Sequence, residues 1–100
     1  MTMSHVMLDL ETFGVGRDAA IATIGACLFD PEAGTVGETF YRKVDLARST
    51  LLGRIDASTV EWWLKQSDEA RKELFTGERQ ELGPALVVFR EWVDAHLPGA

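Results

Sequence analysis

Hydrophobic and polar residues alternate along the first part of the chain, and this period of two is typical of a β-strand. Over residues 5–11, Val6, Leu8 and Leu10 share one face, and the flanking and intervening residues share the other. The next segment, residues 12–18, contains two glycines and lacks this alternation. The pattern therefore predicts a first strand over about residues 5–11.

Two more strands are expected next, joined by a tight turn. Residues 19–30 are almost all small, branched or apolar and have no polar face at helical spacing, which indicates a strand buried on both sides. Gly25 and Ala26 within it indicate a close backbone approach. Proline and glycine at the ends of residues 31–34 indicate a turn, and residues 35–44 resume an extended pattern. We therefore expect an antiparallel hairpin within a three-stranded antiparallel sheet.

The second half of the chain has the spacing of helices. The run Ser58-Thr59-Val60-Glu61 matches a capping box, in which the first and last residues satisfy each other's backbone N–H groups. Val60, Trp63 and Leu64 then fall on one face. These features predict a helix over about residues 58–66.

Two further helices are predicted. Ser67 precedes two acidic residues, which favour the positive end of a helix dipole, and Gly77 is a typical stop signal, so a helix is expected over about residues 68–75. An apolar stripe predicts a third helix over about residues 80–97, closed by Pro98-Gly99. The stripe consists of Leu82, Leu86, Phe89, Val93 and Leu97. Together with the sheet, the three helices indicate an α/β fold.

Length and charge limit the kinds of function. With 100 residues, 46% of them hydrophobic, the chain is expected to form a single domain over residues 1–100. Ten Lys and Arg against 16 Asp and Glu give a net charge of −6. This balance excludes a nucleic-acid groove binder that relies on many phosphate contacts. Any contact with phosphate is then local, or passes through a bound metal ion.

The chain is expected to be cytoplasmic and not membrane-bound. Its longest apolar runs are shorter than the roughly 18 to 20 residues that cross a bilayer, and its start lacks the basic region of a signal peptide. Its single cysteine, Cys27, has no partner for an internal disulfide, which agrees with a reducing compartment.

Asp9 and Glu11 are the first candidates for chemistry. Two residues apart on a strand, they leave the same face with Cα atoms about 6.6 Å apart. Two such charges repel by about 2 kcal/mol at an effective dielectric constant of ~20, so a divalent cation would stabilise the pair. Mg2+ prefers one or two carboxylates together with water and substrate phosphate. The alternative is that both acids are solvated charges on a strand edge.

The surrounding residues resemble a known family. Asp9-Leu10-Glu11-Thr12-Phe13-Gly14, followed by the small and apolar run 18–26 and the turn at 31–34, resembles the first motif of the DEDD 3′-5′ exonucleases. With residues 40–42 and the run 56–67, the chain is similar to the exoribonuclease-like, phage exonuclease VIII-like branch of that superfamily. The resemblance extends from about His5 to Leu97.

This resemblance implies a ribonuclease H-like fold in which four acidic residues hold two divalent ions, Mg2+ or Mn2+. A water activated there hydrolyses the terminal phosphodiester of a nucleic acid. By resemblance, Asp9 would be a ligand of both ions and Glu11 of one, while Thr12, Phe13 and Gly14 would border the terminal nucleotide. The expected partner is the 3′ end of single-stranded RNA or DNA.

The later acidic motifs of the family have no match in this chain. We therefore expect the N-terminal part of such a domain, with two of the four acidic ligands absent. Two functions follow as alternatives. The chain contributes to a metal-dependent 3′-5′ exonuclease, or it is a non-catalytic, truncated domain that acts in self-association or partner binding. For the second, the first strand is expected to present an unpaired edge through which a homo-oligomer could form.

Two aromatic positions have alternative interpretations. Trp62 lies about 100° around its helix from Trp63, so its ring either stacks on a base or packs on other structure. The run Tyr41-Arg42-Lys43 at a strand end either contacts a phosphate or is a solvated edge.

Overall fold

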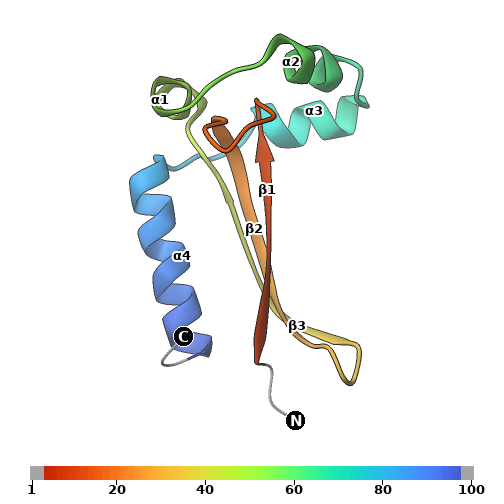
Figure 1. Ribbon diagram of the computed structural model, residues 1–100, viewed down its shortest axis with the longest axis vertical. Coiled ribbons are helices and arrows are strands. Elements are labelled where there is room, and N and C mark those ends of the chain that lie inside the picture. Colours follow the sequence, from red (N-terminus) through yellow and green to blue (C-terminus); the bar gives the residue numbers. More distant parts are fainter. Residues whose placement is uncertain (1–3, 98–100) are drawn as a thin grey trace.

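The computed structural model describes residues 4–97 and contains a three-stranded sheet followed by helices. The predicted α/β class is confirmed. The elements in chain order are β1 (His5–Thr12), β2 (Ile21–Asp30), β3 (Thr35–Lys43), α1 (Leu46–Leu52), α2 (Ala57–Leu64), α3 (Asp68–Phe75) and α4 (Leu82–His96). Figure 1 shows α4 running along one face of the sheet, while α1, α2 and α3 gather at the end opposite the β2–β3 turn. No helix in the described part of the chain is long and apolar enough to cross a membrane.

The sheet has the order β1-β2-β3, and both pairings are antiparallel. The predicted hairpin is confirmed. Asp30 stabilises its turn, since the carboxylate Oδ1 accepts hydrogen bonds from the N–H groups of Glu32, at 3.0 Å, and Ala33, at 3.3 Å. Gly34 follows with φ of +69°, a conformation that favours glycine. Among the described residues, β1 pairs with β2 alone, so it lies at an edge of the sheet.

The strand bounds differ slightly from those predicted. The second strand begins at Ile21, because Ala19 forms an isolated bridge with Arg54 instead of a ladder with β1. The third strand ends at Lys43, and Val44 bridges Gln80. Both departures tie a strand end to a segment distant in sequence, which local periodicity does not reveal.

Helix α1 was not predicted. It has no apolar stripe, and Leu51 and Leu52 are exposed on it. The helix is anchored instead by Ser49, whose buried hydroxyl donates a hydrogen bond to the Ile21 carbonyl at 2.5 Å. A single buried polar anchor has no signature in a hydrophobic pattern.

The predicted capping box at Ser58 is wrong. Helix α2 begins at Ala57 with Asp56 in the N-cap position, so Ser58 lies inside the first turn. Trp63 is buried as expected, but Leu64 is 64% exposed. The predicted bounds of α3 are confirmed, since Ser67 caps it by accepting a hydrogen bond from the Ala70 N–H group.

The predicted face of α4 is rotated relative to the observed one. Leu86 is exposed, whereas Ala85 is fully buried and lets the helix approach the sheet closely. Phe89 and Trp92 pack their rings on Phe40, with centroids 5.4 Å and 5.7 Å away. Two residues of the predicted stripe, Leu82 and Phe89, do pack against the sheet. The rest of the inward face consists of Ala85, Val88 and Trp92, so the stripe is confirmed only in part.

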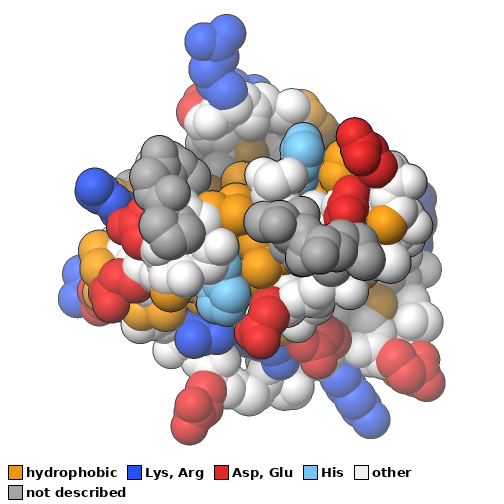
Figure 2. Space-filling model, turned by 90° about the horizontal axis from the view of Figure 1, so that it is seen from below, with side chains coloured by type: hydrophobic (Ala, Val, Ile, Leu, Met, Phe, Trp, Pro, Cys, Tyr) orange, Lys and Arg blue, Asp and Glu red, His pale blue; other side chains and the backbone are white. Residues whose placement is uncertain are grey.

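Two hydrophobic clusters result from this arrangement. The site cluster, at the end of the sheet under α2 and α3, contains Phe13, Ala20, Ala22, Trp63 and Leu74. The α4 cluster, between the sheet and α4, contains Ile24, Phe40, Val44 and Ala85. Helix α4 does not seal the apolar face of β1, where Leu8 is 48% and Leu10 40% exposed. Seen from below, hydrophobic atoms show at the surface between α4 and β1 (Figure 2).

Candidate active site

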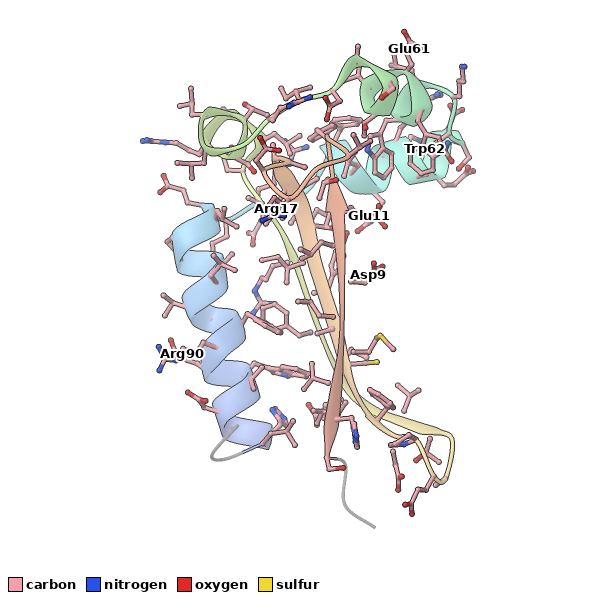
Figure 3. The ribbon with its side chains drawn as sticks, in the orientation of Figure 1. Asp9, Glu11, Arg17, Glu61, Trp62 and Arg90 are labelled. Carbon is pink, nitrogen blue, oxygen red and sulfur yellow. The ribbon has the colours of Figure 1, made fainter. Side chains whose placement is uncertain are left out.

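The carboxylates of Asp9 and Glu11 leave the same face of β1, as the strand spacing predicts. In the register with β2, Asp9 is opposite Gly25 and Glu11 is opposite Thr23. Figure 3 shows both acidic side chains projecting on the side of β1 away from α4. The sheet thus separates these acids from the α4 cluster.

A pocket of about 320 Å³ lies over this face. The sheet provides its floor, and α2 and α3 provide its walls. Its lining consists of Asp9, Glu11, Thr23, Gly25, Tyr41, Trp63, Ala70, Glu73 and Leu74. A Cβ placed on Gly25 would lie 3.6 Å from the Asp9 carbonyl oxygen and 3.9 Å from Tyr41 Cδ1, which are ordinary contacts. The expected close backbone approach at Gly25 is therefore wrong, and the missing side chain instead leaves space in the pocket.

The Glu11 carboxylate is harder to ionise than a solvated one. Partial burial, followed by the charge of Asp9, raises the pKa of Glu11 above its ordinary value. Among the described residues, no hydrogen bond or ion pair engages either side chain. A bound cation would supply the compensation that the protein groups around them do not.

The opposite wall contains an acid that is already compensated. The Glu73 carboxylate lies 3.3 Å from Lys43 Nζ, which also donates a hydrogen bond to the Thr76 carbonyl at 2.8 Å. Burial, and then a hydrogen bond to Glu73, raise the pKa of the Tyr41 hydroxyl. The sequence interpretation missed Glu73, although strand alternation places Tyr41 and Lys43 on one face of β3.

The segment after β1 is held in place by groups from α2. Trp63 Nε1 donates a hydrogen bond to the Thr12 carbonyl at 3.1 Å, and the Asp56 N–H group donates to the Phe13 carbonyl at 2.9 Å. The Phe13 ring is buried in the site cluster, while Thr12 and Gly14 lie beside it at the end of β1. A Cβ on Gly14 would come within 2.8 Å of the Ala19 Cβ, so only glycine fits there.

Asp56 is a second residue that sequence reasoning missed. Its carboxylate Oδ2 accepts a hydrogen bond from the Val15 N–H group at 2.9 Å. This bond, together with the hydrogen bond and charge of Arg54, holds the pKa of Asp56 below its ordinary value. Asp56 therefore ties the loop after β1 to the start of α2 instead of capping the helix.

Trp62 lies off the buried face of α2, as predicted, and is 52% exposed. Its ring packs edge-on against Trp63, with centroids 4.9 Å apart and planes at 79°. Because Trp63 lines the pocket, Trp62 stands next to the pocket wall, on the same side of the molecule as Glu11 in Figure 3.

The oxygen ligands of this site fit a metal ion that takes only part of its coordination from the described residues. Within residues 4–97, no group of three or more Asp, Glu, His or Cys side chains is placed to hold a metal ion. Two carboxylates on one face remain, Asp9 and Glu11. Mg2+ typically binds in this way, through one or two carboxylates, with water and substrate phosphates completing its octahedron.

Comparison with known proteins shows the family to which this chain belongs. Residues 4–99 match the 3'-5' exoribonuclease Rv2179c-like domain, and the chain belongs to this family. It is also 31% identical over 103 aligned positions to an exodeoxyribonuclease of Enterobacteria phage T4. That alignment covers 94% of this chain and 45% of the phage protein, so the chain spans less than half of that relative. No solved structure gives a significant match.

Proposed function

We propose that this chain forms the first part of a DEDD-type, ribonuclease H-like 3′-5′ exonuclease site that acts on single-stranded RNA or DNA. The observation that carries the proposal is the pair of uncompensated carboxylates, Asp9 and Glu11, over a pocket in a member of an exonuclease family. The exoribonuclease family and the phage exodeoxyribonuclease differ in the nucleic acid that they name, so both substrates remain in the proposal.

Asp9 and Glu11 would hold Mg2+ or Mn2+. When bound, such an ion offsets the negative charge that develops on phosphoryl oxygens and lowers the pKa of water. Glu11 supports this role, because its raised pKa marks a carboxylate that gains from a nearby cation.

The neighbouring residues would position the 3′-terminal nucleotide. The backbone of Thr12, Phe13 and Gly14 is fixed beside the carboxylates by Trp63 and Asp56. A rigid backbone next to the reacting bond lowers the entropy cost of orienting a substrate. Trp62, exposed at the pocket wall, is the candidate for stacking on a base.

A complete site would need further acidic ligands, from additional chain or from another copy of this one. A specific observation favours the non-catalytic alternative, self-association. β1 is an edge strand of the described sheet, and Leu8 and Leu10 are exposed on its apolar face. Edge strands of this kind recruit partners.

Digestion assays distinguish the two functions. Single-stranded RNA and DNA labelled at the 5′ end are incubated with the chain and Mn2+, beside the Asp9→Ala variant and the matched control Asp94→Ala on α4. An exonuclease site predicts products that shorten from the 3′ end, lost in Asp9→Ala and kept in Asp94→Ala. A folded wild-type chain that leaves both strands intact while forming a dimer supports the self-association alternative.

Metal binding has its own measurement. An ion that binds only the folded state adds about 2.7 kcal/mol of stability at 100 times its dissociation constant. Thermal unfolding with Mg2+ or Mn2+ should show this gain in the wild type and in Asp94→Ala, and no gain in Asp9→Ala. An equal gain in all three proteins contradicts the assignment of Asp9 as a ligand.

A further inference from the structure

A second, larger pocket adjoins the first. Its volume is about 680 Å³, and it lies between the end of β3 and the segment that connects α3 to α4. Its lining consists of Tyr41, Arg42, Lys43, Glu73, Glu78, Arg79 and Gln80. Tyr41 and Glu73 line both pockets, so the two are continuous along one wall. We call the second pocket the basic groove.

The walls of the basic groove are joined by backbone hydrogen bonds. The Gln80 N–H group donates to the Lys43 carbonyl at 2.9 Å, and the Asp45 N–H group donates to the Gln80 carbonyl at 2.8 Å. Arg79 Nη2 donates to the Leu74 carbonyl at 3.2 Å. The connecting segment is therefore fixed against β3, and the groove exists before any ligand binds.

Three of the ten Lys and Arg residues line the groove, in a chain whose net charge is −6. Two acidic residues, Glu73 and Glu78, line it as well. The ion pair between Lys43 and Glu73 neutralises both partners, so the guanidinium groups of Arg42 and Arg79 exceed the remaining carboxylate, that of Glu78, by one charge. Arg42 donates one hydrogen bond, from Nη1 to the Tyr41 carbonyl, while its guanidinium lies 4.7 Å from the Phe40 ring centroid. A guanidinium has five N–H donors, so Arg42 and Arg79 keep donors available for another acceptor.

We propose that the basic groove binds the phosphodiester backbone of the substrate strand on the 5′ side of the terminal nucleotide. The inference rests on the proposed function, because it takes the 3′ end to lie at Asp9 and Glu11. A strand held there must leave the pocket, and the groove that shares its wall offers Arg donors to phosphate oxygens. Arginine binds phosphate through charge-assisted, often bidentate hydrogen bonds. Such contacts position a strand and do not depend on its sequence.

The groove also explains how a chain with a negative net charge could bind a polyanion. Repulsion from a net charge of −6 opposes binding in general, and the Debye length of about 8 Å at physiological salt limits its range. A strand bound in the groove would lie closer than this length to the guanidinium groups of Arg42 and Arg79, which line it. Phosphate recognition is then local, as the charge balance of the sequence requires.

Binding is measured by fluorescence anisotropy with 5′-labelled single strands of about ten nucleotides, RNA and DNA of equal sequence, in EDTA so that nothing is cleaved. The variants are Arg79→Gln and Arg42→Gln, each retaining a side-chain donor. The matched control is Arg90→Gln, since Arg90 points away from the sheet (Figure 3) and contacts Asp94 on its own helix. Circular dichroism checks that each variant is folded.

The proposal predicts that each groove variant binds about five-fold more weakly at 0.1 M salt, and that the slope of log K against log salt falls by about 0.7 per lost phosphate contact. Arg90→Gln should match the wild type. A single nucleoside monophosphate does not reach the groove. Its inhibition constant, measured by displacement of the labelled strand, should therefore be equal in all proteins.

Other results would overturn the proposal that the groove binds the strand. If the wild type binds both strands and the two groove variants keep its affinity and salt slope, the groove does not contact phosphate, while digestion dependent on Asp9 still stands. If a folded wild type binds neither strand in EDTA, the groove does not bind the strand. The proposed function fails with it only if the digestion assay with Mn2+ also shows no cleavage that depends on Asp9. If the groove variants lose affinity for the RNA strand and keep their affinity for the DNA strand, the groove binds RNA.

Discussion

The two hydrophobic clusters of this protein hold their helices in different ways. In the α4 cluster, aromatic rings of Phe40, Phe89 and Trp92 pack together, with ring centroids 5.4 to 6.2 Å apart. In the site cluster, apolar packing is combined with hydrogen bonds from Trp63 and Asp56 to the backbone after β1. One cluster attaches a helix, and the other shapes the chain beside the candidate ligands.

This difference assigns stability and site geometry to separate parts of the molecule. Helix α4 packs on β2 and β3 on the face opposite Asp9 and Glu11. Helices α2 and α3 line the pocket itself. A weakened α4 cluster should therefore lower the free energy of unfolding, whereas a weakened site cluster should also loosen the segment that borders the carboxylates.

The largest effect is expected for Phe40→Ala. Phe40 is 5% exposed, and truncation of a buried phenylalanine typically costs about 3–5 kcal/mol through lost burial and a residual cavity. Urea denaturation measures this loss. The matched control is Val87→Ala on the exposed face of α4, expected within about 0.5 kcal/mol of the wild type. Equal losses for the two variants would mean that α4 is not held by the Phe40 contacts.

A medium effect is expected for Trp63→Phe, which leaves the Thr12 carbonyl without its 3.1 Å donor. A fully buried acceptor left unsatisfied costs about 1–3 kcal/mol, and because this hydrogen bond is only partly buried we expect a loss of about 1 kcal/mol. Hydrogen exchange at the Val15 amide should accelerate more than the global loss of stability explains. The neighbouring control is Trp62→Phe, whose exposed ring predicts almost no change. If both tryptophan variants behave alike, the hydrogen bond to Thr12 does not stabilise the segment.

The smallest effect is expected for Glu11→Gln in metal-free buffer. Because the pKa of Glu11 is raised in the folded protein, its favourable contribution is complete below the ordinary value of 4.5 and is lost as pH rises through the raised value. Above that range, ionised Glu11 opposes folding, so glutamine should add a few tenths of a kcal/mol. Below pH 4.5 the two proteins should be equally stable.

Chemical denaturation across pH tests this sign, with Glu91→Gln on the outer face of α4 as a control. A gain that is equally large in acid would show that glutamine stabilises by packing and not by removing a charge. Adding Mg2+ should reverse the ranking, since the wild type then gains an ion that the variant holds less well.

Local patterns were sufficient for the features that depend on neighbours in sequence. Strand alternation correctly placed Asp9 and Glu11 on one face, and the Pro and Gly spacing correctly placed the hairpin turn. The Ser67 cap correctly located α3. Local patterns failed at α1, which is anchored through Ser49, and were only partly right at α4, where Ala85 and Trp92 belong to the inward face.

The sequence by itself determined the α/β class, the hairpin and the adjacency of the two candidate ligands, because these follow from backbone periods of 2 and 3.6 residues. Only the tertiary structure decided what surrounds those ligands. Lys43 and Glu73 meet across 30 residues of chain, and Asp56 reaches Val15 across 41. Such contacts depend on how α2 and α3 pack over the sheet, and packing is a property of complementary surfaces that no local period encodes.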